Sequence, residues 1–433
     1  MTSSQRQAEE SAFQPSAEYT ARKKRMDDAM HLRKPDRVPV APLTVHFYPT
    51  RVRGISNRDA MYQPEKTFQA WAEAVVRHNW DAAPSGIASL PPARPLEILG
   101  LKQFQWPGGD LADSMPFQWV EAEYMKQDEY DEMLADPNGF TIRKLWPRIS
   151  TTLATVSRMI QTALPPLLPV SHAHTLPSFL ASFISQSGME GLFSKALELA
   201  EEHRKNRRIA SGYVIEMMNR GFPIHWATAT VHAFDYISDF LRGLKGTSLD
   251  MYRVPDKLLA AIDELTPHMT GAGVTGAERA KNKGVFVPLH RGAAGFMSDK
   301  QFAKFYWPGF KALIWGLIDA GLTPIPFFEG DYTPRLEYLR ELPPGKVVGH
   351  FDQVDRKRAK RLIGDVMCFW GNVPAAIMVT GTPQQVKDQV KELIDIFGDN
   401  GGLIVDSTMG IPDESKEENV QALTDAVHEY GAA

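Results

Sequence analysis

The chain has 433 residues, of which 43% are hydrophobic and 23% charged, and its formal net charge is −4. This composition is typical of a folded soluble protein, and the small net charge gives no general attraction to nucleic acid or to an acidic membrane surface. The single cysteine, Cys368, excludes an internal disulfide and a zinc site built from several cysteines. No secretion signal or membrane-spanning segment is evident, so we expect a cytoplasmic protein.

The N-terminal part of the chain predicts a tail, a helix and a first strand. Residues 1–20 are polar and lack periodicity, which predicts a mobile tail. Residues 21–37 predict a short amphipathic helix that ends before Pro35, and the apolar run RVPVAPL after it predicts a strand. Because His46 and Tyr48 come just past the end of this strand, we expect them to contact a substrate.

The middle of the chain predicts one clear helix, a second strand and two elaborations. Residues 65–81 predict an amphipathic helix, and DAAPSGIASLP after it predicts a strand and its loop. Residues 91–150 are rich in Pro, Gly and Trp and predict a loop-rich region, which at this length is more often functional than idle. Residues 150–270 predict mainly helices. Since no linker is evident, we predict one domain over residues 21–433.

The last third of the chain alternates short apolar runs with helical segments. The runs are GVFVPLHRG, TPIPFFEGD, KVVGHFD, VMCFWGNV and GLIVDST. Strand-sized runs that alternate with helices predict parallel β/α units, and the chain is long enough for a (β/α)8 barrel of about 250 residues with elaborations. Ser298 and Thr382 predict capped helix starts, and Pro308 predicts a bend or break within a helix.

Polar side chains come at or just after the last apolar residue of each of these runs. They are His290, Arg291, Glu329, Asp331, His350, Asp352, Asn372 and Asp406. The C-terminal ends of parallel barrel strands share one face, and that face carries the chemistry in such barrels. We therefore predict that these eight side chains converge on an active site at the mouth of the barrel.

Three longer motifs occur in order in the same region: FMSDKQFAKFYWPGFK, GNVPAAIMVTGTPQQVKDQVKELI and GGLIVDSTMGIPDESKEENVQAL. With them, the sequence from Gly284 to Tyr430 resembles the uroporphyrinogen decarboxylase (URO-D) superfamily, whose barrel members include that decarboxylase and corrinoid-linked methyltransferases. RKPDRVPV also resembles the opening strand of this family. The resemblance implies a (β/α)8 barrel, an enzyme acting on a small molecule, and an assembly compatible with a homodimer.

The sequence departs from both well-known patterns of this family. The decarboxylase pattern has an arginine-rich loop after the first strand and a histidine before the final Gly-Ile, whereas here no such loop is found and Met409 precedes Gly410. The thiol-methylating members have a His-x-Cys pair, at whose positions Phe327 and Glu329 stand here, and another Cys near Met409. Tetrapyrrole decarboxylation and activation of a thiol by zinc–thiolate chemistry are therefore disfavoured.

Two interpretations of the polar residues stay open. In the first, Glu329, His350, Asp352 and Asp406 hold a divalent metal, zinc being the expected ion, which stabilises an alkoxide or phenoxide. In the second, Glu329, His350 and Asp352 act without a metal as acid and base, and Arg291 clamps a substrate carboxylate. The substrate-binding residues predicted in either case are His290, Asp331, Asn372, His46 and Tyr48.

We predict a methyltransferase-type enzyme, such as an O-demethylase, acting on a small oxygenated and by preference aromatic substrate. The methyl carrier implied by the resemblance is a corrinoid on a separate protein, because the chain contains no Asp-x-His-x-x-Gly cobalamin motif. One alternative is a decarboxylase or lyase acting on a carboxylated substrate anchored by Arg291. The other is a non-catalytic barrel that binds a corrinoid, a tetrapyrrole or a partner protein.

Overall fold

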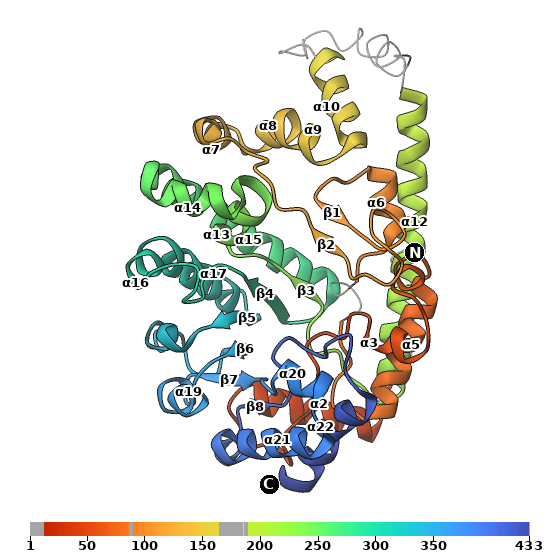
Figure 1. Cartoon of the computed structure of the whole chain (residues 1–433), viewed down its shortest axis with the longest axis vertical. Helices are drawn as coiled ribbons and strands as arrows, with labels where there is room; N and C mark the ends of the chain where they lie inside the picture. Colours follow the sequence, from red (N-terminus) through yellow and green to blue (C-terminus); the bar gives the residue numbers. More distant parts are fainter. Residues whose placement is uncertain (1–12, 86–89, 164–184, 186–188, 433) are drawn as a thin grey trace.

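Parallel strands surrounded by helices make up the centre of the molecule (Figure 1). The computed structural model describes residues 13–85, 90–163, 185 and 189–432. The main sheet has the order β3-β4-β5-β6-β7-β8, with every neighbouring pair parallel. These strands span Thr228–Ala229, Gly284–Leu289, Thr323–Asp331, Val347–Gln353, Met367–Trp370 and Leu403–Ile404. The five apolar runs predicted as strands are therefore confirmed as β4 to β8.

Two irregular segments close these strands into a ring. Val40 forms a parallel bridge with Val405, directly after β8. The amide of Asp81 donates a hydrogen bond to the carbonyl of Val40 at 2.8 Å, and Ala83 forms a parallel bridge with Ile224, shortly before β3. The two N-terminal strands predicted from sequence thus occupy the first and second positions of a (β/α)8 barrel.

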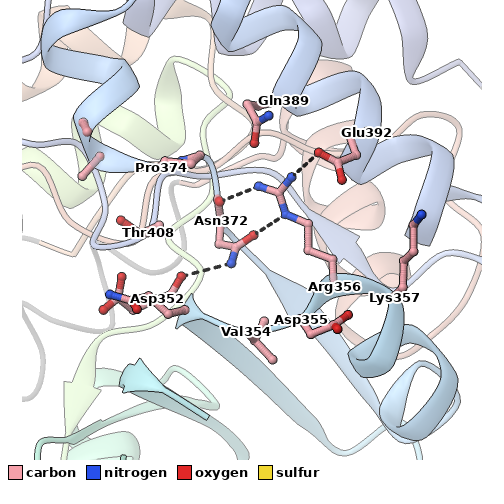
Figure 2. Close-up of a pocket in the computed structure, with 13 residues that line it drawn as sticks. Asp352, Val354, Asp355, Arg356, Lys357, Asn372, Pro374, Gln389, Glu392 and Thr408 are labelled. Carbon is pink, nitrogen blue, oxygen red and sulfur yellow. Dashed lines mark hydrogen bonds and ion pairs between the residues drawn. The ribbon is translucent and has the colours of Figure 1, made fainter. Parts of the chain in front are cut away.

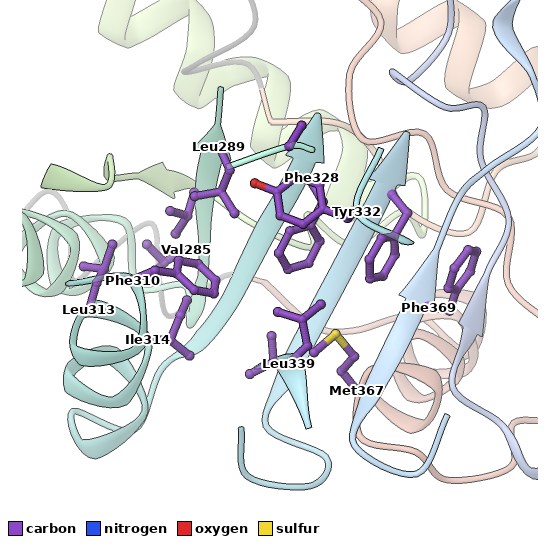
Figure 3. Close-up of a cluster of buried hydrophobic side chains, with 14 of the residues drawn as sticks. Val285, Leu289, Phe310, Leu313, Ile314, Phe328, Tyr332, Leu339, Met367 and Phe369 are labelled. Carbon is purple, nitrogen blue, oxygen red and sulfur yellow. The ribbon is translucent and has the colours of Figure 1, made fainter. Parts of the chain in front are cut away.

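Side chains alternate along the strands between the barrel interior and the surrounding helices. Outward-facing residues pack against helix side chains and include Val285, Leu289, Phe328 and Phe369 (Figure 3). The inward-facing residues form a separate buried cluster of Ala41, Leu43, Ala82, Trp226, Ile325, Phe327, Val348, Cys368, Trp370 and Ile404. Helix α2 (Ala17–Met30) adds Met26, Ala29 and Met30 to this cluster and so closes the N-terminal end of the barrel.

Helices surround the strands of the barrel (Figure 1). They are α5 (Pro64–His78), α15 (Pro255–Ala280), α17 (Trp307–Asp319), α18 (Leu336–Leu339), α19 (Arg356–Ile363), α20 (Ala375–Thr380), α21 (Pro383–Phe397) and α22 (Glu417–Tyr430). Both predicted capping boxes are present, at Ser298 before α16 (Asp299–Gln301) and at Thr382 before α21. The interruption predicted at Pro308 is confirmed, because a π-helical turn, η5 (Phe302–Tyr306), ends there and α17 begins.

The elaborations contain more regular structure than the sequence indicates. The first, together with the loop after the first strand, holds α3 (Tyr48–Val52), α4 (Asn57–Tyr62), α6 (Ala93–Leu99), β1 (Phe104–Gln105), β2 (Gln118–Trp119), η1 (Gln127–Glu129), α7 (Tyr130–Ala135), α8 (Pro137–Phe140), η2 (Thr141–Leu145) and α9 (Trp146–Ile149). The second holds α10 (Thr151–Ala163), α12 (Met189–Asn219), α13 (Ala233–Tyr236), η4 (Ile237–Arg242) and α14 (Gly243–Arg253).

Three predicted segments fall partly outside the described residues. These are the tail, where residues 1–12 are not described, the second-strand loop and the helical elaboration. Within the tail, α2 already begins at Ala17, with the Ser16 side chain accepting a hydrogen bond from the amide of Tyr19. No helix in the described part of the chain is long and apolar enough to cross a membrane.

Asp81 joins the first strand, the second strand and α2. Its carboxylate is fully buried and accepts hydrogen bonds from the guanidinium groups of Arg25 and Arg37, at 2.7 Å each. It also accepts one from the amide of Val40 at 2.9 Å. A carboxylate that is paired in this way is favourable, but removal of the carboxylate leaves guanidinium charge in a poorly hydrated place.

We expect Asp81→Ala to lower the free energy of unfolding by about 3–5 kcal/mol, because Arg37 then loses its carboxylate partner. Denaturant unfolding followed by circular dichroism measures this change. Asp27→Ala is the matched control, since the Asp27–Lys23 pair on the same helix is solvent-exposed and contributes about 1 kcal/mol or less. Equal losses in the two variants would contradict the role assigned to Asp81.

Candidate active site

A hydrogen-bonded network lies at the C-terminal ends of β4 and β5. The Nδ1 atom of His290, directly after β4, lies 2.5 Å from Oδ2 of Asp239 on η4. The Nε2 atom of the same ring lies 3.6 Å from Oε1 of Glu329 on β5. The side chains of His290 and Glu329 are 33% and 31% exposed, so the network reaches solvent. One imidazole therefore stands between two carboxylates at the barrel mouth.

The local structure of β5 explains where Glu329 points. The register between β5 and β6 shifts after Phe328, and Gly330 adopts a φ of 79°, which a glycine tolerates far better than other residues. The amide of Gly330 donates to Oδ2 of Asp352 at 3.0 Å, which fixes the bulge against β6. This irregularity turns Glu329 toward His290 at the end of the strand.

Arg291 is held by protein groups. Its Nε donates to Oγ of Ser238 at 3.0 Å, and its Nη2 donates to Oδ1 of Asp239 at 2.8 Å and to Oε2 of Glu121 at 3.1 Å. Its backbone amide donates to Oδ1 of Asp235 at 3.0 Å. The guanidinium of Arg291 is thus bound to side chains of the protein, among them Asp239. This arrangement differs from the predicted one, in which Arg291 clamps a substrate carboxylate.

The pKa values of His290 and Glu329 are both raised, for different reasons. Burial would lower the pKa of His290, but the hydrogen bond with Asp239 and the charge of Glu329 outweigh it and raise the pKa to about 9. Burial raises the pKa of Glu329 to about 7, with the charges of Asp235 and Asp239 acting in the same direction and His290 opposing. Near neutral pH, His290 carries a proton and Glu329 can give or take one.

His350 and Asp406 pair below the mouth. Both side chains are fully buried, and Nε2 of His350 lies 3.1 Å from Oδ2 of Asp406. Asp406 also accepts hydrogen bonds from the amides of Leu43 and Ser407, at 2.7 Å each. Burial raises the pKa of Asp406, which His350 opposes. The pair therefore ties β6 to the last and first strands from inside the barrel.

The four predicted metal ligands do not form one group. Among the residues that the structure describes, no three His, Cys, Asp or Glu side chains are placed to hold a metal ion. His350 and Asp406 bond to each other, Asp352 accepts from the Gly330 amide, and Glu329 faces His290. Because these side chains are bonded at separate places and do not converge on one point, the arrangement fits acid–base chemistry better than the predicted zinc site.

Asn372 and Asp352 border an open groove of about 690 Å³ beside the mouth (Figure 2). The amide of Asn372 donates to the Asp352 carbonyl at 3.0 Å, and its Oδ1 accepts from Nε of Arg356 at 3.0 Å. Arg356 in turn pairs with Glu392 at 2.8 Å. These contacts hold the loops after β6 and β7 together, which gives Asn372 a structural role at the edge of the predicted site.

Three other predicted substrate-binding residues make their contacts with groups outside the network. Tyr48 is buried at the start of α3, with its hydroxyl 2.9 Å from Nε2 of His78. Asp331 accepts from the amide of Thr333 at 2.8 Å in the turn after β5. His46 lies edge-on to Phe117, and burial lowers its pKa to about 4. Position just after a strand therefore does not by itself bring a side chain into contact with the network.

Asp235, Asp239 and Glu121 belong to the network but are not predicted from sequence. Asp235 and Asp239 are one helical turn apart, on α13 and η4, within HAFDYISDFLRG. Asp235 is buried and accepts from the hydroxyl of Tyr306 at 2.6 Å. Two carboxylates four residues apart in an otherwise largely apolar helical stretch are the signal that could have found them.

The fold and this network define a (β/α)8 barrel with ionisable groups gathered at its C-terminal face. Residues 229–430, just under half of the chain, match the family model described as uroporphyrinogen decarboxylase (URO-D). Members of the URO-D superfamily are enzymes.

Two curated relatives, both named uroporphyrinogen decarboxylase, match the chain over part of its length. The one from Pseudoalteromonas translucida is 32% identical over 141 residues, which cover 32% of this chain and 39% of the relative. The one from Aromatoleum aromaticum is 27% identical over 139 residues, covering 31% and 38%. The chain thus spans well under half the length of either relative.

A solved structure shares the fold over nearly the whole chain. It is a methyltransferase from Methanosarcina mazei, with a TM-score of 0.60 and 15% sequence identity over 94% of this chain and 98% of that one. At this identity the similarity establishes the barrel architecture alone.

We expect Asp239→Asn to lower the pKa of His290 from about 9 toward its ordinary value of 6.5, because the hydrogen bond and charge of Asp239 are lost and burial is then opposed only by the charges of Glu329 and Asp235. Titration of the imidazole nitrogens by ¹⁵N NMR measures this pKa. In the control Asp331→Asn, which changes a carboxylate that does not contact His290, the pKa stays near 9. A His290 pKa that is unchanged in Asp239→Asn would contradict the proposed coupling.

Proposed function

We propose that this chain is a methyltransferase-type enzyme that removes the methyl group from a small oxygenated substrate at the barrel mouth. The observation that carries the proposal is the position of Glu329, partly exposed beside a histidine that Asp239 holds in place. A carboxyl group with a pKa of about 7 is protonated in a large fraction of molecules at neutral pH. Such a group is suited to donate a proton to the oxygen that leaves a methyl ether.

In the proposed reaction, the ether oxygen of the substrate lies within hydrogen-bonding distance of Glu329. A reduced corrinoid on a separate protein would supply the nucleophile that accepts the methyl group. When the methyl carbon–oxygen bond breaks, its electron pair passes to the oxygen, and Glu329 transfers its proton to that oxygen. Protonated His290 then stabilises the carboxylate left on Glu329, while Asp239 holds the imidazole ring in place. The products are an alcohol or phenol and the methylated carrier.

The charges at the mouth support methyl transfer over decarboxylation. The carboxylates of Glu121, Asp235, Asp239 and Glu329 lie around Arg291 and His290. A substrate with several carboxylates would meet like charges there, and the guanidinium of Arg291 is already engaged. We therefore place decarboxylation of a carboxylated substrate second.

We expect Glu329→Gln to reduce kcat for demethylation by about 10²–10⁴-fold, because the amide cannot donate the proton that the leaving oxygen needs. The assay supplies aryl methyl ethers with reduced cob(I)alamin and follows methylcobalamin by absorbance and the phenol by chromatography. Glu337→Gln, at an exposed position on α18, is the control and keeps wild-type turnover. If Glu329→Gln also keeps wild-type turnover, Glu329 is not the acid.

The pH dependence of the wild-type enzyme tests the same assignment. Since the protonated form of Glu329 is the active one, kcat/KM is high below about pH 7 and falls about tenfold per pH unit above it. A pH profile of kcat/KM measures this, with the fall near pH 7 absent in the residual activity of Glu329→Gln. A rate that rises through pH 7 would assign Glu329 the role of a base instead.

A further inference from the structure

We propose that an aromatic wall at the barrel mouth, formed by Tyr236, Phe240 and Trp119, binds the ring of an uncharged aryl methyl ether. This inference rests on the proposed function, because it names the substrate class of the same site. The three residues are accessible to solvent and lie beside the network of His290 and Glu329. The wall therefore needs no space within the packed interior of the barrel.

The helical stretch after β3 brings two aromatic rings next to the network. Asp239 on η4 contacts His290, and Tyr236 and Phe240 come three residues before it and one residue after it. All three residues of this stretch are partly exposed, whereas the intervening residues 237 and 238 are buried. Because residues three and four apart share one side of a helix, the two aromatic rings border the same accessible surface as Asp239. Their ring centroids lie 5.4 Å apart.

Strand β2 supplies the third ring of the wall. Trp119 is 59% exposed, and its ring centroid lies 5.2 Å from that of Phe240, with the two ring planes at 81°. Glu121, two residues further along the chain, accepts a hydrogen bond from Arg291, which joins this segment to the network. An indole ring that is exposed and continuous with other apolar groups indicates a binding surface, and its flat face favours an aromatic ligand.

Ring contacts continue from this wall to the end of the first strand. The ring of Trp119 lies 5.0 Å from that of Phe104, which lies 5.1 Å from Phe117, and Phe117 lies 5.8 Å from His46. Phe117 and His46 are partly exposed. The aromatic groups thus extend between the first and third strand positions of the barrel, next to the fourth and fifth positions that carry the network. A ring on the wall can therefore direct its ether oxygen toward Glu329.

The titratable groups of this surface are uncharged at neutral pH. Burial lowers the pKa of His46 to about 4 and raises the pKa of Tyr236. Since both residues are nevertheless partly exposed, they are surrounded by protein on most sides and still open to solvent, as on a concave surface. The surface offers no positive charge to an anion, and the carboxylates of Asp239 and Glu121 lie beside it. These charges favour an uncharged ring over an aryl carboxylate.

Calorimetry with the full-length protein tests this inference without requiring turnover. The ligands are 4-methoxyphenol, 4-methoxycyclohexanol, which has a saturated ring of similar size, and 4-methoxybenzoate, which carries a negative charge. We expect 4-methoxyphenol to bind roughly 3- to 10-fold more tightly than 4-methoxycyclohexanol, and more tightly than 4-methoxybenzoate. Equal affinities for the aromatic and the saturated ligand, tighter binding of the benzoate, or binding of none of the three would overturn the inference.

The variant Trp119→Leu keeps an apolar side chain but removes the aromatic face. We expect it to bind 4-methoxyphenol and 4-methoxycyclohexanol with affinities within about twofold of each other. Trp315→Leu, at an exposed position on α17, is the matched control and keeps the wild-type preference. Retention of the full preference in Trp119→Leu would overturn the inference, and the wild-type ligand series decides the matter if that variant does not fold.

The inference and the proposed function fail separately. A preference for 4-methoxyphenol that depends on Trp119, without any demethylation, supports the inference and contradicts the proposed function. Demethylation of the aromatic and the saturated ether, with no preference in binding, contradicts the inference and leaves the proposed function standing.

Discussion

The barrel depends on a closure that regular strands do not provide. The first two strand positions are held by single bridges and by the buried carboxylate of Asp81, which binds Val40, Arg25 and Arg37 at once. Closure matters for the site because His290 and Asp406 lie on strands that are far apart along the ring. The two residues face the same barrel interior only when the ring of strands is closed. Helix α2 covers the N-terminal end of that interior.

The mouth combines a high density of carboxylates with few cations. Asp239 binds both His290 and Arg291. The positive charges of these two side chains are therefore paired with a carboxylate of the protein and are less available to bind an anionic substrate. Glu329 is left as the group whose proton is most easily exchanged near neutral pH. In the proposed function, this division favours a neutral substrate over one with several carboxylates.

Much of the C-terminal half was predictable because its signals are local. The apolar runs of β4 to β8, the caps at Ser298 and Thr382 and the break at Pro308 follow from residue spacing and backbone preference, and all are confirmed. The position of polar residues at strand ends also identified His290 and Glu329 as candidate site residues. Tyr48 was a wrong expectation, because the chain turns into α3 after the first strand and buries that side chain in the outer core.

The sequence by itself determined the alternation of parallel strands and helices and the end of the sheet at which polar groups gather. Only the tertiary structure decided which of these groups meet: Glu329 with His290, His350 with Asp406, and Asp239 from a distant π-helical turn with His290. The physical reason is that periodicity and capping act within a few residues. Pairing depends instead on strand register, on the bulge after Phe328 and on ring closure, which contacts between residues far apart in the chain establish together.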